Sequence, residues 1–106
     1  MKALVCEAIT DDLSGVAVRD GEQPVPGPGE VLLRVKATSV NFPDILLCQG
    51  KYQLKLEPPF TPGMDLAGEI AALGPDVDGW SVGDKVCGGS RFGGFAEFIS
   101  VPAAGL

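Results

Sequence analysis

The clearest alternation of apolar and polar positions along the chain covers residues 31–40. Every second residue of this segment falls on one face of a strand, and that face carries Val31, Leu33, Val35 and Ala37. The opposite face carries Leu32, Arg34, Lys36 and Thr38, of which Arg34 and Lys36 are charged. Because side chains alternate across a strand, this pattern predicts a strand with the first face in a core and the second in water.

Shorter apolar segments predict further strands at Lys2–Ile9, Val16–Arg19, Leu66–Leu73, Lys85–Cys87 and Phe95–Val101. They recur about every ten residues and are separated by turn residues, in a chain with 15 glycines and nine prolines. This spacing is typical of a small barrel or sandwich. No alternation of strands and helices occurs, so the sequence predicts no doubly wound nucleotide-binding sheet.

One segment, residues 41–50, has the features of a short helix. Asn41 and Asp44 fit a capping box, and Asp44 also suits the positive end of the helix dipole. Pro43 falls in the first turn, where its missing N–H costs nothing. Gly50 is expected to end the helix in a left-handed conformation.

Length, composition and charge restrict the class of protein. With 106 residues and 45% hydrophobic content, the chain suits one folded domain. Its net charge is −6 and it has no basic run, which argues against a nucleic-acid partner. No apolar stretch approaches the roughly 20 residues that span a bilayer, so we expect no membrane insertion and a cytoplasmic location.

Reactive-site chemistry is limited by the absence of histidine. Histidine general-base catalysis and cysteine–histidine catalysis are excluded. Cys6, Cys48 and Cys87 are widely spaced and are expected to be reduced, mostly buried thiols.

The glycine-rich segment Gly88–Gly94 contains no lysine followed by serine or threonine, the pair that a phosphate-binding P-loop requires. It is interpreted as a hairpin connection whose glycines permit positive φ. Arg91 in this segment has two readings: it contacts an anionic group of a ligand or partner domain, or it is a solvated loop residue.

Five motifs then occur in one order across nearly the whole chain: PGPGEVLLRV (26–35), VNFPD (40–44), PFTPGMDLAG (59–68), VGDKV (82–86) and GGFAEF (93–98). Together they resemble the N-terminal domain of the medium-chain dehydrogenase/reductase superfamily, in its zinc-free quinone oxidoreductase (zeta-crystallin-like) branch. The resemblance implies a mainly β fold over residues 1–106: a GroES-like, partly open β-barrel with one or two short helices.

The zinc enzymes of this superfamily carry cysteine, histidine and glutamate ligands on the matching segments. Here Asn41 and Asp44 stand in the element of the cysteine ligand, and Met64-Asp65 replaces the histidine–glutamate pair. The four-cysteine structural zinc lobe is also missing. The resemblance therefore implies no metal site and no zinc alcohol dehydrogenase activity.

In zinc-free relatives, NADPH delivers hydride to a quinone or enone, or to an enoyl thioester. The resemblance implies that Asn41 and Pro43 contact the cofactor and that Asp44, Leu46 and Met64 line the substrate pocket. Many relatives have an aromatic residue at the position of Leu46. Tyr52 is the candidate catalytic residue, since its hydroxyl can donate a hydrogen bond to a substrate carbonyl; alternatively, it covers the barrel mouth.

The resemblance also implies a partner, the Rossmann domain that follows in relatives and binds NADPH. We therefore expect a truncated chain that neither binds NADPH nor turns over alone. Its uncovered face predicts some homo-oligomer formation. The alternative is a standalone GroES-like module that binds a ligand or partner. A co-chaperonin-like ring is disfavoured because no long polar mobile loop is visible.

Overall fold

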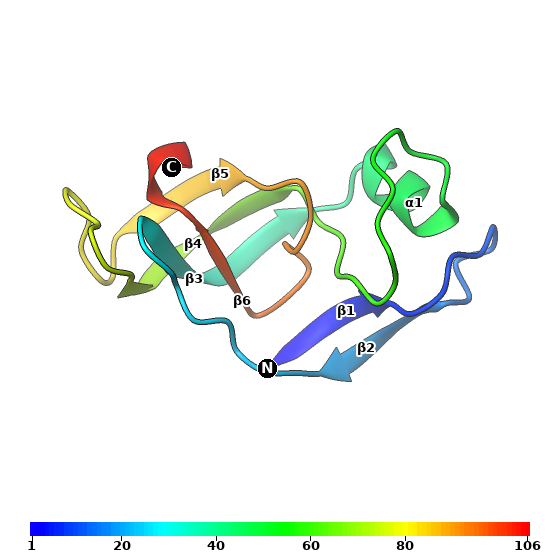
Figure 1. The fold of residues 1–106 in the computed structure, drawn as a ribbon, viewed down its shortest axis with the longest axis horizontal. Helices are drawn as coiled ribbons and strands as arrows, with labels where there is room; N and C mark the ends of the chain where they lie inside the picture. The colour runs from blue at the N-terminus through cyan, green and yellow to red at the C-terminus, as the bar shows by residue number, and fades with distance from the viewer.

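The computed structural model describes residues 1–106 as six strands, one α-helix and one short 3-10 helix (Figure 1). The elements are β1 (Lys2–Cys6), β2 (Val16–Asp20), β3 (Glu30–Ser39), α1 (Phe42–Gln49), β4 (Asp65–Leu73), β5 (Lys85–Gly89), β6 (Phe98–Pro102) and η1 (Ala103–Gly105). The predicted mainly β class with one or two short helices is confirmed. No helix has the length and apolar character that crossing a bilayer requires.

The strands form two antiparallel sheets. Four strands pair in the order β5-β4-β3-β6, and β1 pairs with β2. Figure 1 shows the β1–β2 sheet beside the end of the larger sheet that lies nearer to α1. The two sheets do not close into one ladder, so the barrel is partly open, as expected.

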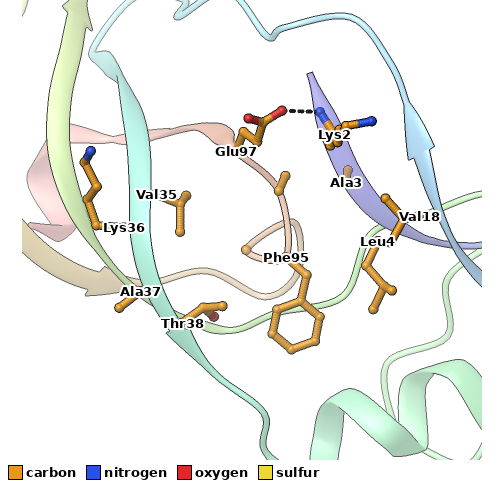
Figure 2. Close-up of a pocket in the computed structure, with 12 residues that line it drawn as sticks. Lys2, Ala3, Leu4, Val18, Val35, Lys36, Ala37, Thr38, Phe95 and Glu97 are labelled. Carbon is orange, nitrogen blue, oxygen red and sulfur yellow. Dashed lines mark hydrogen bonds between the residues drawn. The ribbon is translucent and has the colours of Figure 1, made fainter.

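Residues 95–97 join the two sheets. On one side, the Leu4 N–H donates to the Phe95 carbonyl (2.8 Å) and the Glu97 N–H donates to the Lys2 carbonyl (3.0 Å). On the other side, the Val35 N–H of β3 donates to the Glu97 carbonyl (2.9 Å). Figure 2 shows this segment between β1 and β3, with a further bond from the Lys2 N–H to the Glu97 side chain. The segment predicted as the start of the last strand therefore lies between the sheets, and β6 begins only at Phe98.

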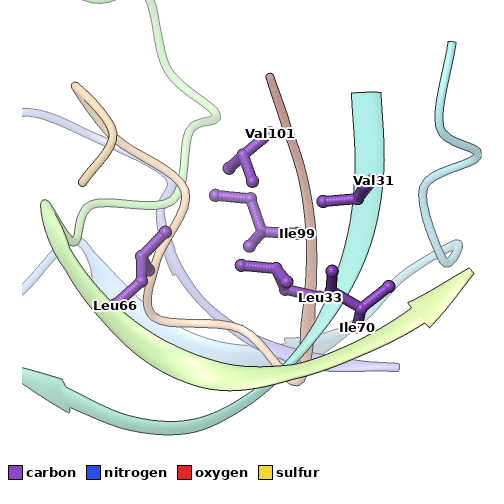
Figure 3. Packing of buried hydrophobic residues seen from close by; sticks show 6 residues of the cluster. All are labelled: Val31, Leu33, Leu66, Ile70, Ile99 and Val101. Carbon is purple, nitrogen blue, oxygen red and sulfur yellow. The ribbon is translucent and has the colours of Figure 1, made fainter. Parts of the chain in front are cut away.

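The main core lies on one face of the larger sheet and contains only aliphatic side chains from β3, β4 and β6: Val31, Leu33, Leu66, Ile70, Ile99 and Val101 (Figure 3). Val31 and Leu33 are fully buried, as the alternation predicts. Leu32, on the face predicted to lie in water, is buried as well, and the register against β4 shifts between Leu32 and Leu33. Ala37 was expected on the same face as Val31 and Leu33 but is exposed. The register against β4 shifts between Val35 and Ala37, so the simple period of two fails beyond this bulge.

Gly68 explains how β3 and β4 pair at this bulge. A Cβ atom at Gly68 would lie 2.1 Å from the Arg34 carbonyl oxygen, which belongs to the backbone and cannot rotate away. Only glycine therefore allows the two strands to approach this closely.

Helix α1 contributes Leu47 and Cys48 to a second buried cluster, which also contains Cys6 and Phe60. The capping box at Asn41 is present, and Gly50 ends the helix at φ 70°, as predicted. Cys6 and Cys48 are buried free thiols, whereas Cys87 is exposed. The expectation of mostly buried thiols thus holds for two of the three.

The interpretation of Gly88–Gly94 as a hairpin connection is wrong. β5 pairs with β4 and β6 pairs with β3, so the segment links the two opposite edges of the four-stranded sheet. Of its glycines only Gly93 has a positive φ, at 100°. The glycine content signals close backbone approach, because a Cβ atom at Gly94 would lie 2.9 Å from the Gly63 carbonyl oxygen.

Candidate functional site

The start of α1 and the start of β4 are joined by a polar network of Ser39, Asn41 and Asp65, here named the asparagine network. The Asn41 side-chain amide donates to Asp65 Oδ2 (2.8 Å) and to Ser39 Oγ (3.1 Å). The Ser39 hydroxyl in turn donates to the same Asp65 oxygen (3.0 Å). Both amide hydrogens of Asn41 are therefore used in hydrogen bonds. These bonds fix the orientation of the side chain, which stays half-buried.

Asp44 is a buried residue that bonds to the backbone of the same region. It is only 2% exposed. Its Oδ2 accepts the Asn41 backbone N–H (2.8 Å), and its Oδ1 accepts the Gly63 backbone N–H (3.2 Å). A buried charge is tolerated only with such partners. Asp44 thus connects the first turn of α1 to the loop that leads into β4.

A cleft of about 530 Å³ lies beside the asparagine network. We name it the Tyr52 cleft; its walls come from the loop after α1, the start of β4 and the segment after β5: Tyr52, Gln53, Leu54, Met64, Gly89, Ser90 and Arg91. The cleft brings together two of the predicted site residues, Tyr52 and Met64. Asn41 does not line the cleft; its amide bonds to Asp65, which follows the lining residue Met64 along the chain.

The remaining predicted site residues lie elsewhere. Pro43 is in the first turn of α1, and Leu46 is half-buried on the same helix. Asp44 lines a separate apolar cavity of about 290 Å³, under the helix, together with Leu4 and Cys48. Of the three predicted pocket residues, Met64 thus lines the cleft, Asp44 lines the separate cavity and Leu46 lines neither.

The cavity under the helix is unsuited to thiol chemistry. Burial, reinforced by the neighbouring Cys6, raises the pKa of Cys48 to about 12. Since the thiolate is the nucleophile, a thiol with this pKa is inert near neutral pH. Cys48 therefore acts as an apolar packing group.

A groove of about 430 Å³ lies between β1–β2 and β3, with the Phe95 ring directed into it (Figure 2). Its floor is apolar, and its polar groups are at the rim. Lys2 is paired with Asp20, and Glu97 accepts the Lys2 backbone N–H. The groove is the gap in the partly open barrel, and it contains none of the predicted site residues.

The donor set around β4 does not match a catalytic zinc site, which typically takes three protein ligands from Cys, His and carboxylate. The structure gathers no group of three or more such side chains. Asn41 and Met64 offer an amide and a thioether, and Asp65 Oδ2 already accepts two hydrogen bonds. The residues at this site offer hydrogen bonds and apolar contact.

The model of the alcohol dehydrogenase GroES-like domain matches residues 27–106. The chain belongs to this family. Among curated relatives, the GroES-like domain is 42% identical over 86 residues to the rat synaptic vesicle membrane protein VAT-1 homolog (81% of this chain, 21% of the relative). It is 42% identical over 96 residues to mouse quinone oxidoreductase-like protein 2 (91% of this chain, 27% of the relative).

Among solved structures, the GroES-like domain superposes on the quinone oxidoreductase from Thermus thermophilus, which was also solved in complex with NADPH. The TM-score is 0.82 at 33% identity, over 100% of this chain and 31% of the Thermus chain. This chain thus spans between a fifth and a third of the length of these three relatives. The expected membership of the quinone oxidoreductase type is confirmed at the level of the N-terminal GroES-like domain.

Sequence reasoning missed part of the cleft of this GroES-like domain. Gln53 lines it although no pattern along the chain singles it out, and Gly89 and Ser90 line it although their glycine-rich segment was interpreted only as a connection. Asp65 was considered only as a substitute for a zinc ligand, whereas the structure makes it the partner of the Asn41 amide. That pairing joins residues 24 positions apart and depends on the register of β3 against β4.

Proposed function

We propose that this chain is the substrate-side domain of a cytoplasmic, zinc-independent quinone oxidoreductase that uses NADPH. The observation that carries the proposal is the Tyr52 cleft, an open pocket with a phenol at its wall and with Met64, the residue before the Asp65 that orients the Asn41 amide, in its lining. The names of the matched relatives support the same class of reaction.

The proposed partner is a Rossmann domain in the rest of the protein, which would hold most of the nucleotide. On this side, Asn41 and Pro43 would form the wall against the nicotinamide ribose and ring. The asparagine network suits this role because both amide hydrogens of Asn41 already form hydrogen bonds, which fixes the orientation of its side chain. NADPH, when bound, supplies the hydride.

The proposed substrates are quinones, enones or enoyl thioesters, which share an electron-poor carbon conjugated with a carbonyl group. Leu54 and Met64 offer apolar surface to the ring or chain of the acceptor. The Tyr52 hydroxyl would donate a hydrogen bond to the carbonyl oxygen as negative charge develops there. Asp44 acts indirectly, by holding Asn41 and the loop before β4 in place.

A chimaera tests the proposal. Residues 1–106 replace the matching third of the Thermus quinone oxidoreductase, and NADPH oxidation is followed by the loss of the absorbance of its reduced nicotinamide, with a neutral quinone as acceptor. We expect quinone-dependent turnover that a strong zinc chelator does not reduce. The 106-residue chain alone should give neither turnover nor heat on titration with NADPH.

Two results would contradict the proposal. A folded chimaera that binds NADPH without oxidising it would favour the alternative, a standalone ligand- or partner-binding module. Turnover that disappears with the chelator and returns with zinc would show that the site depends on metal.

A further inference from the structure

Arg91 is the only charged residue that lines the Tyr52 cleft. The other two arginines are engaged, since Arg19 pairs with Glu7 (2.9 Å) and Arg34 lies 5.3 Å from the centre of the Phe98 ring. Arg91 takes part in none of the ion pairs of the chain, although the chain carries a net charge of −6. Of the two arginines without a carboxylate partner, Arg34 lies over the Phe98 ring and Arg91 lies at the wall of this cleft.

The segment that carries Arg91 is fixed on both sides. Before it, the Ser90 N–H donates to the Met64 carbonyl (2.8 Å), and the Ser90 hydroxyl donates to the Phe92 carbonyl (2.8 Å). After it, the Gly93 N–H donates to the Thr61 carbonyl (2.7 Å). The backbone on either side of Arg91 is therefore tied to the loop before β4, which holds the base of the Arg91 side chain at the cleft.

We propose that Arg91 is a specificity-determining residue that binds an anionic substituent of the hydride acceptor. The preferred acceptors would then be quinones or enones with a carboxylate, sulfonate or phosphate group, rather than neutral ones. This inference rests on the proposed function, because it takes the Tyr52 cleft as the acceptor site.

The residues of the cleft match three kinds of group on an acceptor: a carbonyl oxygen, a ring and an anionic substituent. Tyr52 and Gln53 offer hydrogen-bond donors to a carbonyl oxygen, and Leu54 and Met64 offer apolar contact to a ring. A guanidinium presents paired donors that match the two oxygens of a carboxylate or phosphate. A neutral acceptor would leave this charge without a partner, whereas an anionic one would gain charge-assisted hydrogen bonds.

Titrations of the ¹⁵N-labelled 106-residue chain test the inference, with backbone amide shifts as the readout. The probes are anthraquinone-2-sulfonate, anthraquinone-2-carboxylate and the neutral 2-(hydroxymethyl)anthraquinone, which share one ring system. We expect both anions to shift amides of residues 52–54 and 89–91, and to bind about tenfold more tightly than the neutral probe, a factor that corresponds to about 1.4 kcal/mol. Because Arg91 is exposed, this preference should shrink as salt is added.

Variants test whether Arg91 causes the tighter binding of the anionic probes. Arg91→Ala should bind all three probes with equal affinity, whereas Arg91→Lys should keep part of the preference. Lys85→Ala, which removes an exposed cation outside the cleft, is the matched control and should behave like the unchanged chain. Inorganic sulfate alone, at the same concentrations, should shift the amides only weakly.

The outcomes separate this inference from the proposed function. Equal affinity for charged and neutral probes, or a preference that survives Arg91→Ala, would overturn the role of Arg91 and leave the hydride-transfer proposal intact. The absence of shifts at the cleft with any probe would overturn the inference as well. The proposed function would then be judged by turnover of the chimaera, which uses a neutral quinone.

Discussion

The core of the four-stranded sheet and the region at the start of α1 are built on opposite principles. The sheet core contains six aliphatic residues and no polar side chain. The helix region contains a buried carboxylate, an amide bonded to Asp65 and an open cleft. Apolar packing therefore stabilises the domain, while the polar groups whose burial costs free energy are concentrated where a ligand is expected.

The largest expected effect is on the sheet-core side. Leu33 is fully buried between β4 and β6, so Leu33→Ala removes apolar contact and leaves a cavity. We expect a loss of about 2–5 kcal/mol in the free energy of unfolding, measured by urea denaturation. Val25→Ala, at a site that is 85% exposed, is the control and should change the value by less than about 0.5 kcal/mol. Similar losses for the two variants would contradict the assignment of the core.

A smaller loss is expected on the helix side, at Asp44. Asp44→Ala removes the acceptor of two backbone N–H groups, at Asn41 and Gly63, and leaves both buried or half-buried without a partner. We expect a loss of about 1–3 kcal/mol in urea denaturation. Asp44→Asn, which keeps one acceptor oxygen, should lose less.

The exposed Asp78→Ala is the matched control for Asp44. If Asp44→Ala were no more destabilising than this control, the carboxylate would not be the link between α1 and the loop before β4.

The thiols give a pH-dependent test of the cluster beneath the helix. The pKa of Cys48 is raised from an ordinary value of 9.0 to about 12, chiefly by burial. The unfolded chain therefore loses this proton first, and the stabilisation, complete below pH 9, is lost progressively as pH rises towards 12. The urea midpoint should fall over this range, and the fall should be shallower in Cys48→Ala.

Thiol labelling checks the same cluster at mildly alkaline pH. An aromatic disulfide reagent should modify the exposed Cys87 rapidly, and Cys6 and Cys48 only after urea is added. Rapid labelling of all three thiols in the folded chain would contradict the burial of the cluster.

The strands, the helix and its caps could be predicted because each depends on neighbours along the chain. The period of two marks β3, and Asn41, Pro43 and Gly50 mark the ends of α1. The hairpin expected at residues 88–94 failed because strand order depends on pairing between distant segments, which local turn residues do not encode. The buried face of β3 failed at Ala37 for a related reason, a bulge set by its pairing with β4.

The candidate site was predictable only in part. Family motifs indicated Asn41, Tyr52 and Met64, which the fold brings to one side of the molecule. The bond from Asn41 to Asp65 and the fixed position of the Arg91 loop arise from contacts between residues far apart in sequence. Such contacts require the assembled sheet.

The most direct test of the account compares Asn41→Ala with the unchanged sequence in the Thermus chimaera. We expect kcat/KM for NADPH to fall about tenfold, equivalent to about 1.4 kcal/mol, because the variant loses the oriented Asn41 amide from the wall that would contact the cofactor. The thermal midpoint should fall by only a few degrees, because the lost helix cap is worth about 1 kcal/mol and Asp44 still accepts the backbone N–H of residue 41. Unchanged kcat/KM in a folded variant would contradict the claim that the helix end of this domain serves hydride transfer.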